Sequence, residues 1–224
     1  VVHYASLRHF TGAGKFVDSY QEDETTDFHT MVSEMADIPR KQAKTINLGL
    51  FYGMGKGKLM SQLGVNLETA SELLASYNER VPFVKQLMND TMNKAGKKGY
   101  LSTLEGRRCR FDQWEPTNEW GQKSLPLAEA QQQYGEHMIK RAWTYKALNR
   151  LIQGSAADQT KKAMLELDKE GYLAHIQVHD ELDFSVASDA DKAKIKDIME
   201  NCVELAVPSK VDVECGDNWG DAGD

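Results

Sequence analysis

The sequence predicts an α+β fold, with a mostly helical first part and a second part that combines helices with antiparallel strands. Through residues 28–95, apolar residues recur at helical spacing between capping residues and glycines. Further along, residues 174–178 and 182–186 alternate apolar and polar side chains, as the two strands of a hairpin do. A chain of 224 residues with 41% hydrophobic content can bury one sizeable core or two small ones.

Residues 40–53 are predicted to form the helix that carries the most chemical information. Pro39 suits the first turn and Gly53 stops the helix, and between them four side chains recur every four residues: Arg40, Lys44, Leu48 and Tyr52. Such a set stays on one face, with its cations at the positive end of the helix dipole. A triphosphate suits that end, and a nucleobase can stack on the ring at the other. A surface helix with two solvated cations fits this helix equally well.

The other elements follow from local signals. We expect helices at 28–35, 58–63 and 66–79, with Asn66 as a cap, and another that starts at Pro82. Residues 101–111 read as a hairpin that turns at Glu105–Gly106, from which Arg107 and Arg108 project. The remaining predictions are a loop at 112–126, helices at 127–151 and 155–170, a helix with an apolar stripe at 195–206, and a last strand around 211–213.

Polar residues mark two further places. His179, Asp180 and Glu181 lie between the two predicted strands and therefore in a hairpin turn, where adjacent carboxylates repel each other unless a cation is near. Asn149 and Gln153 are one helical turn apart. Both amides suit the hydrogen-bond acceptors that every base pair presents in the minor groove, although amides that cap a helix junction would look the same.

The net charge of −7 argues mildly against general affinity for nucleic acid, but the charges are segregated along the chain. Cations gather at 40–58, 94–110 and 140–150, while acids crowd at 18–27 and after 212. Phosphate binding depends on the local field, so these runs keep nucleic acid open as a partner. The three widely spaced cysteines suggest a reducing compartment and no structural zinc. No apolar run or signal peptide suggests a membrane, and we expect a cytoplasmic protein.

Four segments together resemble the family A DNA polymerases, the DNA polymerase I family. Residues 40–53 resemble the fingers helix, LSTLEGRRCRF at 101–111 the TLxGRR hairpin, Asn149 with Gln153–Gly154 the NxxxQG helix, and HDE at 179–181 the palm carboxylate segment. The segments occur in the family's order. Leu48, where cellular members usually have Phe, and the 112–126 loop suggest a phage lineage, for which the compartment is the bacterial host cytoplasm.

The resemblance implies a DNA-templated DNA polymerase with Mg²⁺ as cofactor and primer–template DNA and dNTPs as partners. It implies that Asp180 and Glu181 bind metal, that Arg40 and Lys44 act on the triphosphate, and that Leu48, Tyr52 and Gly53 shape the nucleotide pocket. It further implies that Asn149, Gln153, His179, Arg107 and Arg108 contact DNA.

The resemblance also implies a division into a fingers region at 1–126 and the remainder of the palm at 127–224. The family's first carboxylate segment has no counterpart in this sequence, so we expect a C-terminal fragment that is inactive by itself. The alternative is a non-catalytic fragment that binds nucleic acid and nucleotide.

Overall fold

The computed structural model describes residues 1–23, 25–51, 54–119 and 121–222. The chain divides into two compact units, Val1–Ile152 and Gln153–Asp224, and each is described by itself. Helices dominate, and the strands form small two-stranded antiparallel sheets. This composition confirms the predicted α+β class. The predicted boundary at residue 126 separates a fingers region from a palm region by function. The division into compact units does not test it, so it stays a prediction.

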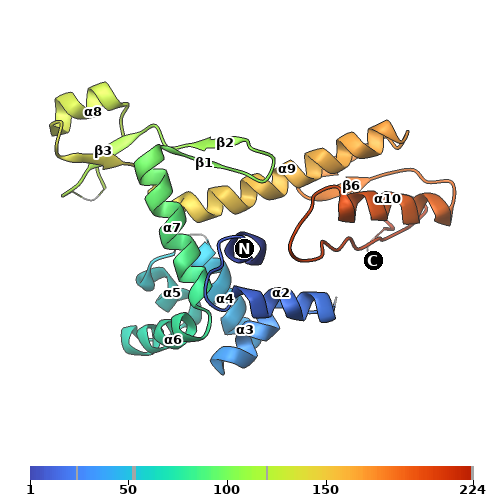
Figure 1. The fold of residues 1–224 in the computed structure, drawn as a ribbon, viewed down its shortest axis with the longest axis horizontal. Helices are drawn as coiled ribbons and strands as arrows, with labels where there is room; N and C mark the ends of the chain where they lie inside the picture. The colour runs from blue at the N-terminus through green and yellow to red at the C-terminus, as the bar shows by residue number, and fades with distance from the viewer. Residues whose placement is uncertain (24, 52–53, 120, 223–224) are drawn as a thin grey trace. The chain divides into compact units, whose positions relative to one another are not determined.

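The first unit begins with a group of helices (Figure 1). They are α1 Val2–Ser6, α2 Ala13–Glu22, α3 Phe28–Ala36, α4 Arg40–Phe51, α5 Lys56–Leu63, α6 Leu67–Arg80 and α7 Pro82–Lys98. α3 packs against α4 and α6, α4 against α5, and α6 against α7. The predicted cap is confirmed, since Asn66 Oδ1 accepts a hydrogen bond from Thr69 N at 2.9 Å. Local signals therefore placed α3 to α7 correctly, whereas α1 and α2 were not predicted from the sequence.

Aromatic rings join the helices of this group. The ring of Phe16 from α2 lies 5.3 Å from that of Phe28 and 5.0 Å from that of Phe83, measured between centroids. Phe51, at the end of α4, lies 6.1 Å from Phe28. These tilted and edge-on arrangements are those that aromatic pairs prefer. They fix α4 against α3, and so fix which face of α4 stays open.

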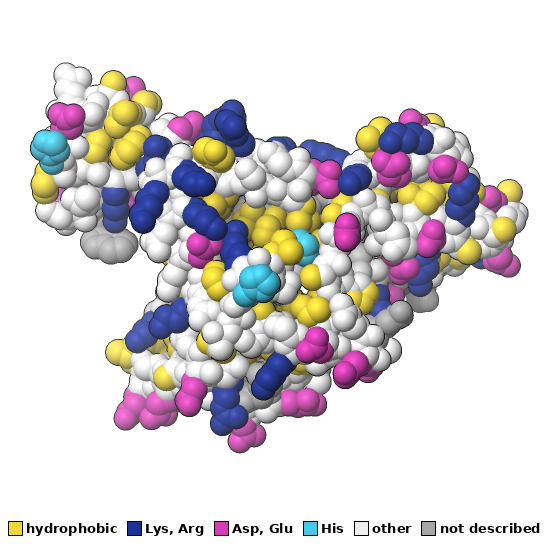
Figure 2. All heavy atoms as spheres, viewed as in Figure 1, with side chains coloured by type: hydrophobic (Ala, Val, Ile, Leu, Met, Phe, Trp, Pro, Cys, Tyr) yellow, Lys and Arg dark blue, Asp and Glu magenta, His cyan; other side chains and the backbone are white. Residues whose placement is uncertain are grey.

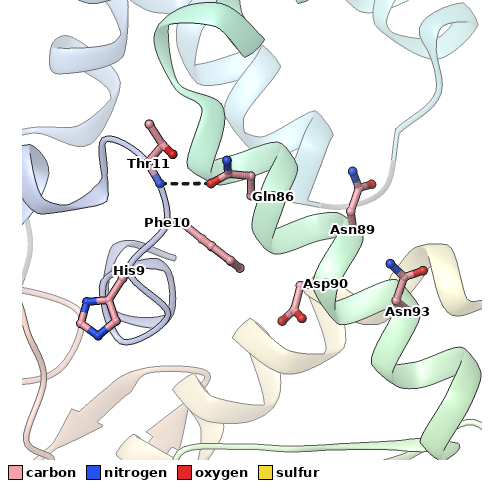
Figure 3. Close-up of a pocket in the computed structure, with 7 residues that line it drawn as sticks. All are labelled: His9, Phe10, Thr11, Gln86, Asn89, Asp90 and Asn93. Carbon is pink, nitrogen blue, oxygen red and sulfur yellow. Dashed lines mark hydrogen bonds between the residues drawn. The ribbon is translucent and has the colours of Figure 1, made fainter.

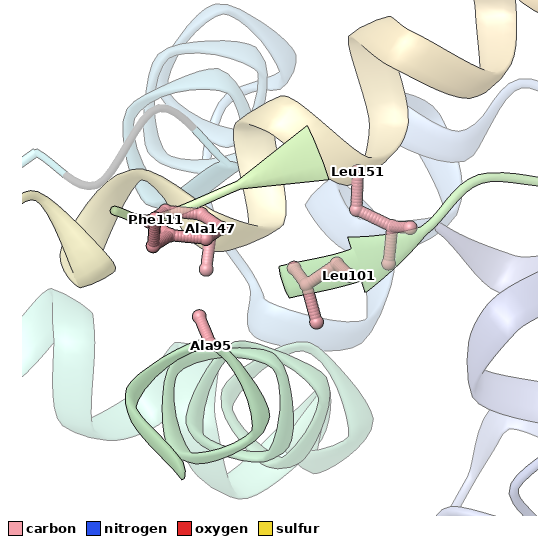
Figure 4. Close-up of a cluster of buried hydrophobic side chains, with 5 residues drawn as sticks. All are labelled: Ala95, Leu101, Phe111, Ala147 and Leu151. Carbon is pink, nitrogen blue, oxygen red and sulfur yellow. The ribbon is translucent and has the colours of Figure 1, made fainter. Parts of the chain in front are cut away.

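The predicted hairpin at 101–111 is confirmed. Strand β1 (Tyr100–Ser102) pairs with β2 (Arg108–Arg110), and Leu101 lies opposite Cys109. Gly106 has a φ of 79°, which a residue without a Cβ adopts at no steric cost. The hairpin covers a core that α7 and the start of α9 complete (Figure 4), formed by Ala95, Leu101, Phe111, Ala147 and Leu151.

Residues 112–146 differ from the prediction of a loop followed by one long helix. They form β3 (Trp114–Pro116), α8 (Leu127–Tyr134), β4 (Ile139–Arg141) and a short 3₁₀ helix, η1 (Thr144–Lys146). β3 and β4 pair antiparallel, with Trp114 opposite Arg141. α8 ends where Gly135 takes a φ of 90°. The pairing joins segments far apart in sequence, so helical composition alone gave the wrong result.

Residues 147–169 form one continuous helix, α9 (Ala147–Lys169), instead of the two helices that the sequence predicted. Gly154 lies inside it, where glycine costs about 1 kcal/mol relative to alanine but does not by itself end a helix. Asn149 and Gln153 therefore do not cap a helix junction. The division between the two units falls within α9.

The second unit contains the other predicted hairpin. Strand β5 (Ile176–Val178) pairs with β6 (Glu181–Asp183), and Val178 lies opposite Glu181. Helix α10 (Asp189–Asn201) follows, capped by the Ser188 hydroxyl, which accepts from Asp191 N at 3.2 Å. Ile195 is its buried apolar residue. The predicted last strand is wrong, because residues 211–213 have no regular structure.

Candidate functional site

α4 places its predicted site residues on one open face. Arg40, Lys44 and Leu48 are exposed, with 39% of Leu48 accessible. The opposite stripe is buried and consists of Ala43, Ile46, Asn47 and Gly49. The spacing of four residues thus leaves two cations and one apolar side chain on the surface of the helix. Tyr52 and Gly53, the other two predicted pocket residues, lie outside the described residues.

Arg40 is held in place by the start of α3. Its Nη2 and Nε atoms both lie 2.9 Å from Asp27 Oδ2, and Nε lies 3.1 Å from Thr30 Oγ1. Asp27 also caps α3, since Oδ2 accepts from Thr30 N at 2.9 Å. Burial by itself would raise the pKa of Asp27, but the hydrogen bonds from Thr30 and Arg40 lower it to about 2. The guanidinium is therefore oriented before any ligand binds.

A buried polar chain that sequence reasoning missed lies behind this face. Tyr77 of α6 donates to Asn47 Oδ1 at 2.5 Å, and Asn47 Nδ2 lies 2.9 Å from His29 Nδ1. Burial lowers the pKa of His29, Asp27 raises it, and the charges of Arg40 and Lys44 lower it further. A signal was present in the sequence. Asn47 lies on the same helical stripe as Ala43, Ile46 and Leu50, and a buried amide needs hydrogen-bond partners.

The start of α9 packs on the hairpin β1–β2, which carries two other predicted residues. Arg150, next to Asn149, donates from Nη1 to Arg110 O at 3.0 Å and lies over the Phe111 ring at 4.9 Å. Arg107 and Arg108 are exposed on the hairpin, and the guanidinium of Arg108 lies 4.7 Å above the Tyr100 ring. Lys and Arg side chains gather over this hairpin and along the C-terminal part of α7 (Figure 2).

Gln153, four residues after Asn149 on α9, is exposed. Arg141 belongs to β4 and lies outside α9. Its Nη1 donates to Phe111 O at 2.7 Å and its guanidinium lies 4.6 Å above the Trp114 ring. Arg141 therefore ties the β3–β4 pair to the end of the β1–β2 hairpin.

In the second unit, His179 and Asp180 form the turn between β5 and β6, and Glu181 begins β6. All three are exposed, and His179 has a positive φ of 54°, a conformation that histidine tolerates better than most residues. Its carbonyl accepts from Gln177 Nε2 at 2.5 Å. The predicted turn is thus confirmed for His179 and Asp180, while Glu181 is a strand residue.

The carboxylates of this turn suit Mg²⁺ by their chemistry. Mg²⁺ is usually bound by one or two carboxylates together with phosphate oxygens and water. Asp180 and Glu181 provide such a pair, and Asp183 on the same strand adds a buried oxygen, Oδ2, with no hydrogen-bond partner among the described residues. Within those residues, no group of three or more candidate ligands is close enough to hold a metal. The turn therefore fits one side of a metal site.

A pocket in the described part of the chain lies elsewhere. It has a volume of about 480 Å³ and lies between the segment after α1 and helix α7 (Figure 3). Thr11 N donates to Gln86 Oε1 across it at 3.1 Å. None of the predicted site residues lines it. No helix in the described ranges is long and apolar enough to span a membrane.

The described residues thus include an exposed cationic helix face, a basic hairpin and a turn with two carboxylates. Residues 6–221 match the family described as DNA polymerase family A. The chain belongs to DNA polymerase family A.

Relatives of this polymerase domain come from phage and bacteria. It is 37% identical to a DNA-directed DNA polymerase of Pseudomonas phage M6, over 98% of this chain and 36% of that protein. It is 31% identical to the thermostable DNA polymerase I of Thermus aquaticus, over 95% of this chain and 25% of that protein. The chain thus spans about a third or less of these relatives.

A solved structure has a similar fold. The POL domain of Pol1 from M. smegmatis, in complex with a DNA primer-template and dNTP, matches with a TM-score of 0.66 and 28% identity. The match covers 86% of this chain and 34% of that one.

Proposed function

We propose that this domain takes part in DNA-templated DNA synthesis, in which the primer 3′ oxygen attacks the α-phosphorus of a dNTP. The observation that carries the proposal is the exposed row of Arg40, Lys44 and Leu48 on α4, with the opposite stripe of that helix buried. Family membership and the primer-template and dNTP in the M. smegmatis complex support it.

Each unit has its own part in the proposal. Arg40 and Lys44 neutralise the triphosphate, Lys44 also gives a proton to the departing pyrophosphate, and Leu48, Tyr52 and Gly53 shape the nucleotide pocket. Arg107 and Arg108 contact backbone phosphates, and Asn149 and Gln153 donate to minor-groove acceptors. His179 lies near the primer terminus. The pre-oriented guanidinium of Arg40 supports its role, because an ordered donor loses less entropy on binding.

Asp180 and Glu181 are the proposed Mg²⁺ ligands, with Asp180 the stronger. When bound, the metal stabilises the negative charge that develops on the reacting oxygens. A two-metal centre takes carboxylates from more than one segment of the chain. Asp180 and Glu181 belong to one such segment. We therefore expect the purified chain to bind primer–template DNA and dNTP without extending the primer.

A hybrid enzyme tests the proposal. Residues 1–224 replace the aligned segment of the Pseudomonas phage polymerase, and primer extension and DNA affinity are measured separately. We expect Mg²⁺-dependent extension that Asp180→Ala abolishes, because the metal matters most as charge develops in the transition state. DNA affinity should change by less than about threefold, since DNA binding rests on phosphate contacts.

Asp212→Ala is the matched control, because it removes an exposed carboxylate of the same unit outside the turn. It should leave extension unchanged. Undiminished extension by Asp180→Ala would remove this residue from the catalytic role. A hybrid that binds DNA and dNTP but never extends would favour a function in binding alone.

A further inference from the structure

A chain of buried hydrogen bonds links three helices of the first unit, α3, α4 and α6 (Figure 1). Tyr77 is completely buried, and its hydroxyl donates to Asn47 Oδ1 at 2.5 Å. Asn47, also completely buried, presents Nδ2 to His29 Nδ1 at 2.9 Å. The half-buried His29 ends the chain, so a tyrosine on α6 reaches a histidine on α3 through one amide.

The donors and acceptors in this chain fix one arrangement of protons. A phenol has one proton to donate, an amide oxygen only accepts, and an amide nitrogen only donates. If the Asn47 amide were reversed, the Tyr77 oxygen would accept from Nδ2, but the buried Tyr77 proton would lose its acceptor, and a buried donor without its partner costs about 1–3 kcal/mol. Asn47 therefore keeps Nδ2 toward His29. Nδ1 of the ring must accept, and the ring proton lies on Nε2.

The same arrangement opposes a positive charge on His29. A doubly protonated ring would place an N–H at Nδ1 against the N–H of Asn47. The charged groups that act on the ring are Arg40 and Lys44 of α4, which disfavour the cation, and Asp27 before α3, which favours it. Burial also disfavours the cation and is the largest influence.

We propose that Tyr77 is a positioning residue that, through Asn47, holds His29 as the neutral ring protonated on Nε2, beside Arg40 and Lys44. The inference rests on the proposed function in one respect, namely that these two cations receive nucleotide phosphates. A neutral His29 leaves the charge of this face to the guanidinium of Arg40 and the ammonium of Lys44. Tyr77 thereby makes phosphate affinity insensitive to pH near neutrality.

The first test follows the ring directly, by ¹⁵N NMR of histidine-labelled 224-residue chain across pH. In the wild type, His29 Nδ1 should be unprotonated in the neutral ring, and the ring should titrate below the usual range. In Tyr77→Phe, which keeps the aromatic ring but removes the hydroxyl, Asn47 is free to reverse and accept from Nδ1–H. The spectrum should then show mixed tautomers, and titration should move to higher pH.

Tyr172→Phe is the matched control, because it removes a hydroxyl that donates to Asp191 Oδ1 in the other unit. It should leave the His29 signals unchanged. Asn47→Asp supplies a second variant, since a carboxylate accepts from both Tyr77 and Nδ1–H and should drive the ring toward the cation. Identical His29 tautomers and titration in the wild type and in both variants would overturn the proposal.

The second test measures binding of inorganic tripolyphosphate from about pH 8 to about pH 6. Relative to the wild type, affinity for Tyr77→Phe should rise by about twofold to tenfold as pH falls, because His29 becomes a third cation; this is the range that one hydrogen bond supports. No binding by the wild type would contradict the proposed phosphate site and leave the NMR result standing. Binding with unchanged NMR signals would contradict the role of Tyr77.

Discussion

Asp27 performs two tasks at the point where α3 begins. Its Oδ2 accepts from the backbone and hydroxyl of Thr30, which caps the helix, and from the guanidinium of Arg40 on α4. A residue that looks like an ordinary cap therefore also sets the direction of a proposed phosphate-binding side chain. The two tasks can be separated, because asparagine caps a helix about as well as aspartate but carries no charge.

Asp27→Asn should lower stability by no more than about 1 kcal/mol at pH 7, since the Arg40–Asp27 pair is partly exposed. Folding lowers the pKa of Asp27 to about 2, so its contribution is complete above its unfolded pKa of about 3.9 and disappears as pH falls toward 2. Urea unfolding of both proteins at several pH values measures this. A stability difference that persists unchanged at pH 2 would contradict the ion pair.

At the scale of elements, Gly99 shows how the end of α7 depends on a distant strand. It caps α7 with a φ of 77°, and a Cβ placed there would lie 2.6 Å from the guanidinium carbon of Arg141. That guanidinium cannot move away freely, because Phe111 O and the Trp114 ring hold it. The end of α7 and the β3–β4 pair therefore both depend on the space beside Gly99 that the Arg141 guanidinium occupies.

Gly99→Ala should destabilise the chain by about 1–3 kcal/mol, from the positive φ and the displaced Arg141. Gly96→Ala, three residues earlier inside α7, should instead stabilise it by up to about 1 kcal/mol, because a Cβ there meets nothing within 4 Å. Thermal unfolding compares the two. The loss of stability caused by Gly99→Ala should be smaller in a protein that also carries Arg141→Ala. An equal loss with and without Arg141→Ala would mean that all of the strain lies in the backbone.

At the scale of the whole molecule, positive and negative charges are segregated, so that one region is rich in cations although the net charge is negative. The net charge is −7, yet the hairpin β1–β2 exposes Arg107, Arg108 and Arg110 and the end of α7 exposes Lys97 and Lys98. Cations that lie within a Debye length of about 8 Å of one another act together, whereas distant acids are screened. Phosphate binding is therefore compatible with an acidic chain.

Primer–template affinity should fall steeply as salt rises from about 50 to about 200 mM, because bound cations release counterions from DNA. Arg108→Ala should weaken binding alike for all sequences and reduce the slope of log affinity against log salt by about 1. Lys194→Ala removes a cation of the other unit, already paired with Glu170 at 2.6 Å, and should leave the slope unchanged. Fluorescence anisotropy measures all three. Equal slopes for wild type and Arg108→Ala would exclude this contact.

The sequence by itself determined the elements whose signals are local. The cap at Asn66, the start at Pro82 and the turn at Gly106 each depend on neighbours a few residues away, and the structure contains all of them. The turn at His179 and Asp180 followed in the same way from its two flanking strands. The open face of α4 followed from its spacing, because four-residue repeats keep to one side of a helix.

The tertiary structure decided what depends on distant partners. Strand β4 formed within a segment of helical composition because β3 lies beside it. Arg40 pairs with Asp27, 13 residues earlier in the chain, and Asn47 pairs with Tyr77, 30 residues later. Such choices depend on which polar groups meet once the apolar stripes pack, since a buried amide or carboxylate must find a partner. Periodicity and capping do not indicate which distant polar groups become partners, because that depends on how the helices pack.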